Sequence, residues 1–150
     1  MTGDGPGESV RSLSGPALTH LGDDPELAVQ VAVGTQHFGG GVATLTLHGD
    51  GRATLVRRRA DGEERGDGEL GADERRALGE ELDSLGLVDL RPGDGPREPG
   101  DVPVEVMVAH GGRPVHQEHL WYGDRYTDPA LDRLIRRFDA LVGRLEEVPR

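Results

Sequence analysis

The fold is decided by residues 42–56, which read VATLTLHGDGRATLV. On both sides of the turn Gly49-Asp50-Gly51, apolar side chains alternate with polar ones, which is the period of a strand with one buried face. A glycine-rich turn between two such runs predicts an antiparallel hairpin, with strands over residues 42–48 and 52–59. Residues 27–33, LAVQVAV, alternate in the same way, so three adjacent antiparallel strands are expected.

Two helices are predicted farther along the chain. Leu78, Leu82 and Leu85 recur at helical spacing and predict a helix over residues 72–84, which Gly86 is expected to end. Near the C-terminus, Asp128 is a typical N-cap and is followed by Pro129, which suits the first position of a helix. An apolar stripe at helical spacing follows, formed by Leu131, Leu134, Ile135, Phe138, Leu141, Val142 and Leu145.

A second hairpin is expected between the helices, where residues 104–109 alternate and His110-Gly111-Gly112-Arg113 leads into a strand over residues 114–122. Residues 60–69 are acidic and punctuated by glycine, so we expect a connection there. Residues 91–100, with three prolines and three glycines, predict an exposed loop. The resulting order β-β-β-α-β-β-α predicts an α+β fold, with a mainly antiparallel sheet of about five strands and two helices on one of its faces.

The length of 150 residues is that of one domain. Residues 1–24 are rich in Gly, Ser, Pro and Asp, and their apolar residues are too sparse for either period. This segment is predicted to be a flexible N-terminal tail. Residues 25–147 are then expected to form a single α+β domain.

Missing residue types exclude several chemistries. The chain has no Cys and no Lys, which removes thiol nucleophiles, disulfides, cysteine zinc sites, Schiff bases and the lysine of phosphate-binding loops. The serines do not lie in the Gly-x-Ser-x-Gly turn of a nucleophile; they are Ser9, Ser12, Ser14 and Ser84. We therefore expect no catalytic residues, no cofactor and no enzymatic activity.

The net charge is −11, and residues 61–101 carry most of it, with fourteen acids against five arginines. Such a field repels phosphate backbones and anionic lipids, so nucleic acid and membranes are poor candidate partners. No apolar run approaches the length of a membrane span, and the first residues do not resemble a signal peptide. A cytoplasmic protein is expected. The abundance of Gly, Ala, Arg and Pro is the pattern of a GC-rich genome, which we expect to be bacterial.

The glycine-rich segment 34–41 is the first candidate site. It leads into a strand and not into a helix, so it lacks the geometry of a phosphate cradle. Its glycines permit two arrangements. Either Phe38 folds back over the edge of the sheet, or Gln36, His37 and Phe38 project as an anchor for a protein partner.

Three histidines near the second hairpin raise the question of a metal site. His116 and His119 are three residues apart, so on a strand they point to opposite faces and do not ligate one ion. His116 and Glu118 share a face, but two ligands are too few for a tetrahedral site. We therefore expect no metal site, and a small metal-binding or ligand-binding domain around His110, His116 and His119 remains the alternative.

Residues 120–126 contain the sole Trp and both Tyr of the chain. Trp121 or Tyr122 is suited to cover the end of the core where the last strand meets the C-terminal helix. The alternative is a recognition patch beside the glycine-rich segment, formed by Trp121, Tyr122 and Tyr126.

Three motifs carry a resemblance to known proteins: residues 37–41 (HFGGG), residues 47–55 (LHGDGRATL) and residues 68–74 (GELGADE). Their order resembles a family of small bacterial α+β domains of unknown function, which have a Phe-Gly loop, a Gly-Asp-Gly turn, a helix, a hairpin and a final helix beginning at Pro. More loosely, residues 27–146 are similar to emfourin, an inhibitor of thermolysin-type metallopeptidases. Emfourin-type proteins have a Gly-Gly-Phe loop, whereas Phe38 precedes the glycines here.

These observations together predict a non-catalytic protein-binding or regulatory module. The resemblance to emfourin implies a metallopeptidase as its partner. A purely structural interaction domain is a further alternative to the metal-binding or ligand-binding domain.

Overall fold

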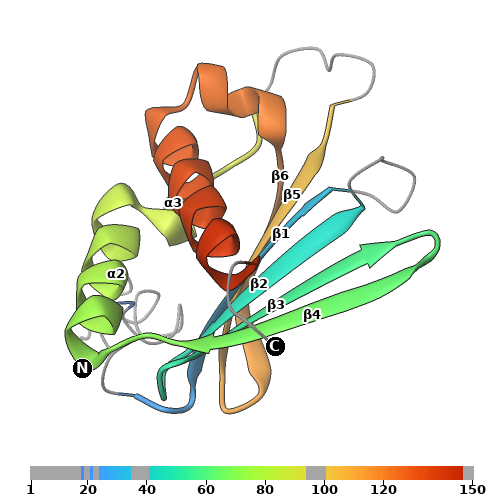
Figure 1. Cartoon of the computed structure of the whole chain (residues 1–150). Coiled ribbons are helices and arrows are strands. Elements are labelled where there is room, and N and C mark those ends of the chain that lie inside the picture. The colour runs from blue at the N-terminus through green and yellow to red at the C-terminus, as the bar shows by residue number, and fades with distance from the viewer. Residues whose placement is uncertain (1–17, 19–20, 22–23, 35–40, 94–100, 147–150) are drawn as a thin grey trace, which may run out of the picture.

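The computed structural model describes residues 18, 21, 24–34, 41–93 and 101–146. These residues form an α+β fold with one six-stranded antiparallel sheet in the order β4-β3-β2-β1-β5-β6. The strands are β1 (Leu27–Gly34), β2 (Val42–His48), β3 (Arg52–Arg59), β4 (Gly62–Glu69), β5 (Pro103–His110) and β6 (Arg113–Trp121). The helical elements are α2 (Ala72–Leu85), η2 (Leu87–Asp89), η3 (Tyr122–Tyr126) and α3 (Pro129–Glu146). Figure 1 shows α2 and α3 on the same face of the sheet.

Strand β4 corrects the prediction for residues 60–69. These residues form a two-residue turn and a full strand, with pairs running from Arg59 and Gly62 to Arg52 and Glu69. The sheet therefore has six strands instead of about five, and the order is β-β-β-β-α-β-β-α. An edge strand needs no apolar alternation when ionic cross-strand pairs hold it. Here Arg58 Nη2 lies 2.9 Å from Glu63 Oε1.

Two glycines let β4 pass beneath the end of α3. A Cβ on Gly66 would lie 3.2 Å from the carbonyl oxygen of Leu145, and a Cβ on Gly68 would lie 2.6 Å from Leu145 Cδ2. The inner side of β4 is thus covered by helix without contributing large side chains of its own. This is why its sequence lacks the hydrophobic signal of a strand.

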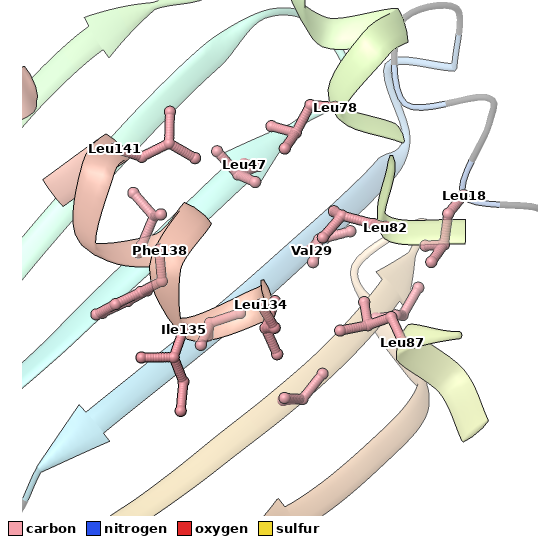
Figure 2. Close-up of a cluster of buried hydrophobic side chains, with 14 of the residues drawn as sticks. Leu18, Val29, Leu47, Leu78, Leu82, Leu87, Leu134, Ile135, Phe138 and Leu141 are labelled. Atoms are coloured by element: carbon pink, nitrogen blue, oxygen red, sulfur yellow. The ribbon is translucent and has the colours of Figure 1, made fainter. Parts of the chain in front are cut away.

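The core lies between the inner face of the sheet and the two helices. Figure 2 shows Val29 and Leu47 of the sheet beneath Leu82 of α2 and Leu134 and Phe138 of α3. All five are at most 5% exposed. Burying a side chain of this size stabilises a fold by about 1.5–3 kcal/mol, so this one face supplies most of the apolar stabilisation.

The predicted helix ends are confirmed. Gly86 ends α2 in the left-handed region, at φ 81°, a conformation that glycine adopts without strain. Asp128 accepts hydrogen bonds from the backbone of Ala130, at 3.1 Å, and of Leu131, at 3.4 Å. It therefore caps α3 as its position before Pro129 indicates.

Part of the segment predicted as a flexible tail belongs to the core. Leu18 and Leu21 are 2% and 1% exposed and pack with the buried cluster. The prediction for residues 1–24 is therefore wrong for these two side chains, and most of that segment lies outside the described residues. A leucine pair three residues apart is too short a pattern to reveal docking, because the surface that receives it is built by α2.

Gly79 of α2 makes this docking possible and gives a sharp test. A Cβ there would lie 2.4 Å from the backbone oxygen of Leu18, whereas a Cβ on Gly143 of α3 meets nothing within 4 Å. In an open helical position, Gly→Ala stabilises a protein by about 0.5–1 kcal/mol.

We therefore predict opposite signs for the two substitutions. Gly143→Ala should raise the free energy of unfolding by about 0.5–1 kcal/mol, and Gly79→Ala should lower it by about 1–3 kcal/mol because the added methyl displaces Leu18. Urea unfolding of the full chain measures both. An increase with Gly79→Ala would show that Leu18 does not dock there.

Candidate interaction surface

The chain turns sharply between β6 and α3, and η3 forms this turn. Tyr122 donates its backbone N–H to Val102, at 2.8 Å, and its ring packs against the core. Asp101 accepts a hydrogen bond from the backbone of Gly123 at 3.0 Å. Asp124 accepts one from the backbone of Gly93 at 2.9 Å. These contacts fix η3 from the side of the preceding loop.

Arg125 is the centre of a tyrosine–arginine cluster, formed by Tyr122, Arg125, Tyr126 and Asp132. Its guanidinium carbon lies 4.8 Å from the ring centroid of Tyr122 and 6.0 Å from that of Tyr126. The guanidinium also donates hydrogen bonds to the Tyr122 hydroxyl and, at 2.7 Å, to Asp132 Oδ1. With its side chain only 14% exposed, Arg125 is held in one orientation by cation–π and ionic contacts.

Asp132 forms ion pairs with two arginines and thereby fixes the guanidinium of Arg125. Its carboxylate accepts from Arg125 and, through Oδ2, from Arg136 at 2.7 Å. The hydrogen bond from Arg125, followed by that from Arg136, lowers the pKa of Asp132 below its ordinary value. The same contact with Asp132 raises the pKa of Arg125. Both groups therefore remain charged in neutral solution.

Tyr126 is the part of the cluster that faces solvent. Among the described large hydrophobic side chains, only Val115, at 36%, and Tyr126, at 80%, are exposed. The backbone of η3 is fixed by its hydrogen bonds, whereas the Tyr126 ring points into solvent beside the guanidinium of Arg125. A tyrosine and an arginine are the residue types most often found at the centre of protein interfaces.

The other sequence-predicted partner residues are divided between two places. Trp121 pairs with Pro103 on the face of the sheet opposite the helices, and it is half-buried. Gln36, His37 and Phe38 lie outside the described residues. Strand β1 ends at the same end of the sheet as β6, because Val33 pairs with Val104 and Val104 pairs with Leu120. The structure thus places Trp121 and Tyr126 at one end of the sheet, on different sides.

The three histidines do not converge. His116 pairs with the inward-facing Val108, whereas His119 lies on the opposite face, with Nδ1 3.3 Å from Glu105 Oε2. His110 Nε2 lies 2.9 Å from Asp24 Oδ2. His116 Nε2 is buried without a hydrogen-bond partner among the described residues. No three His, Asp or Glu side chains in the described ranges are grouped as metal ligands.

Three cavities beside α3 are small. Their volumes are about 70, 100 and 230 Å³, whereas sites for drug-sized molecules typically occupy about 300–1,000 Å³. The largest of the three is a surface depression between Glu81 and the arginines Arg133, Arg136 and Arg137. These three cavities are therefore smaller than a typical site for a drug-sized molecule.

Sequence reasoning missed Arg125 and Asp132. The signal was present, because Arg125 stands between two tyrosines in YGDRY and Asp132 follows seven residues later. Asp132 could be placed on the polar side of the last helix, but its contact with Arg125 depends on the sharp angle between η3 and α3. That angle cannot be read from periodicity.

No protein-family model matches the chain, and the search of curated proteins finds no match. Within the described residues, no helix is both long enough and apolar enough to cross a membrane.

The ion pairs of Asp132 predict an acid-dependent contribution to stability. Because its pKa is lowered in the folded state, the contribution is complete above the unfolded pKa and is lost as pH falls through the folded pKa. Wild-type protein should therefore be more stable than Asp132→Asn at neutral pH, and the difference should shrink in acid. Urea unfolding across the acid range measures this, and parallel curves would contradict it.

Because the three histidines lie apart, we predict that zinc does not change the stability of the protein. Micromolar Zn²⁺ should not raise the melting temperature, and EDTA should not lower it. A folded-state site with free metal at about 100 times its dissociation constant would add about 2.7 kcal/mol of stability, which a thermal melt detects. A Zn²⁺-dependent rise that His116→Ala abolishes would establish the alternative metal-binding function.

Proposed function

We propose that this chain is a non-catalytic protein-binding module and that Tyr126 is the anchor of its contact surface. The observation that supports this most directly is the exposure of Tyr126, at 80%, beside an arginine whose side chain is only 14% exposed. An aromatic ring this exposed leaves apolar area in water, and burying it against a partner recovers that free energy.

The rigidity of the cluster supports a role in binding. Association costs about 0.5–1.5 kcal/mol for each flexible side chain that becomes ordered. Arg125 is already ordered by Asp132 and by Tyr122, so a partner that contacts it does not meet this cost again. Tyr126 adds contact area with few rotatable bonds, which keeps its own ordering cost low.

The narrower form of the proposal is that the partner is a thermolysin-type metallopeptidase, which the module inhibits. This rests on the resemblance of residues 27–146 to emfourin and on no contact described above. Titrating a thermolysin-type peptidase with the full chain, and following hydrolysis of a peptide substrate, tests it directly. Undiminished hydrolysis at a large molar excess would remove the metallopeptidase and leave the binding module intact.

Tyr126→Ala tests the wider proposal. The substitution should leave the melting temperature nearly unchanged, because the ring is exposed. It should weaken partner affinity by about 2 kcal/mol, which is about 30-fold. The partner is first captured from the native cell with the wild-type chain and identified by mass spectrometry, and its affinity is then measured by calorimetry.

Val115→Ala is the matched control, because Val115 is the other exposed large hydrophobic residue in the described part of the chain and lies near the opposite end of β6. It should bind the partner with unchanged affinity. If Tyr126→Ala also binds normally, the anchor is elsewhere, and the alanine triple variant of Gln36, His37 and Phe38 is the next test.

A further inference from the structure

The sheet has a second face that the described helices do not cover. Along residues 27–32 of β1, buried residues alternate with half-buried ones, and the half-buried Ala28, Gln30 and Ala32 point away from α2 and α3. Figure 1 shows both helices on the other side. We call the outward positions of the six strands the open face.

The centre of the open face holds few ionic residues. The half-buried outward residues of β1, β2, β3 and β5 are Ala28, Gln30, Ala32, Gly34, Val42, Thr44, Thr46, His48, Thr54, Val56, Pro103, Glu105 and Met107, and Glu105 is the one Asp, Glu or Arg among them. Charged residues make up 30% of the chain, so these thirteen positions would hold about four at average composition, and they hold one. A solvated sheet surface has no need to avoid charge in this way, whereas the centre of an interface does.

Most of the ionic residues of the open face have an oppositely charged or histidine partner within the same chain. Arg58 contacts Glu63 at 2.9 Å and Arg65 contacts Asp67 at 3.5 Å on one side, and Glu105 contacts His119 at 3.3 Å on the other. The full set of outward ionic residues is Arg52, Arg58, Arg65, Glu63, Asp67, Glu69 and Glu105. The face is therefore almost neutral in a chain whose net charge is −11.

The size of the open face is that of a stable interface. Six strands spaced about 4.8 Å apart and about eight residues long, at about 3.3 Å per residue, span an area of about 750 Å². A standard interface buries about 800 Å² of each partner. The area of the whole face is close to that value.

We propose that the open face binds a second copy of this chain, so that two sheets stack face to face about a two-fold axis. Two chains of charge −11 repel each other through most surfaces, and the open face is nearly neutral and therefore allows close approach. Antiparallel sheets pack in this way about 10 Å apart, and two-fold dimers are the commonest oligomers. An axis through the middle of the sheet places Thr46 of β2 close to its own copy.

This dimer is independent of the proposed function. The tyrosine–arginine cluster belongs to η3 and α3, which pack on the helix side of the sheet. Both copies of Tyr126 stay outside the dimer interface. Failure of one proposal therefore leaves the other unaffected.

Sedimentation of the full chain tests the dimer. The monomer has a mass of 16.1 kDa, so micromolar protein should sediment with twice that mass. Thr46→Arg introduces like charges near the axis and should raise the dimer dissociation constant by about 100-fold or more. Ala140→Arg adds the same charge at an exposed position of α3 and should leave the dimer unchanged, while circular dichroism verifies that each variant is folded.

The absence of cysteine from the chain supplies a second test that does not require Thr46→Arg to fold. Thr46→Cys should form a covalent dimer with a short bifunctional maleimide, and Ala140→Cys should not. Wild-type protein that remains monomeric at high micromolar concentration would overturn the proposal. So would a dimer that survives Thr46→Arg, or cross-linking that is equal at both positions, because another surface would then be the interface.

Discussion

The burial of one face of a two-faced sheet is the constraint on which the rest of this structure depends. Strand β1 lies between β2 and β5, and the alternation of Leu27, Val29 and Val31 with smaller or polar residues commits one side of the sheet to the helices. Because the side-chain period of a strand is two, the same alternation fixes what the other side presents. Core and open face are therefore two consequences of one pattern.

The parts that sequence reasoning could predict are those whose signal is local. The hairpin at Gly49-Asp50-Gly51, the cap at Asp128 and the end of α2 at Gly86 each depend on a few adjacent residues. Strand β4 was missed because it lacks apolar alternation, although its partner strand β3 is adjacent in the sequence. The docking of Leu18 and Leu21 was missed because the helix that receives them, α2, is distant in the sequence. Of the candidate site, Tyr122 and Tyr126 were singled out as aromatics, whereas Arg125 and Asp132 required the angle between η3 and α3.

Because the chain has no lysine, its ion pairs with Asp and Glu are formed by arginine and histidine. Arg137 donates to Glu81 at 2.7 Å, and Arg144 donates to Glu74, so two ionic contacts join α3 to α2 at the rim of their contact. Exposed pairs of this kind contribute little each, about 0–1 kcal/mol. Their main consequence is local neutrality, because they place arginines of α3 beside glutamates of α2, a helix with five acidic residues and two arginines. Apolar burial beneath them holds the helices to the sheet.

The two surfaces proposed for association differ in shape and in charge. The tyrosine–arginine cluster has one exposed ring and one fixed cation, which favours a partner with a pocket for the ring and acceptors for the guanidinium. The open face is broad, carries few ionic residues at its centre and presents mostly short side chains there, which favours a second flat surface. A small anchor suits a partner of different shape, whereas a broad face suits its own copy. If both hold, each dimer presents two anchors, and a partner with two sites binds with the added strength of bivalent attachment.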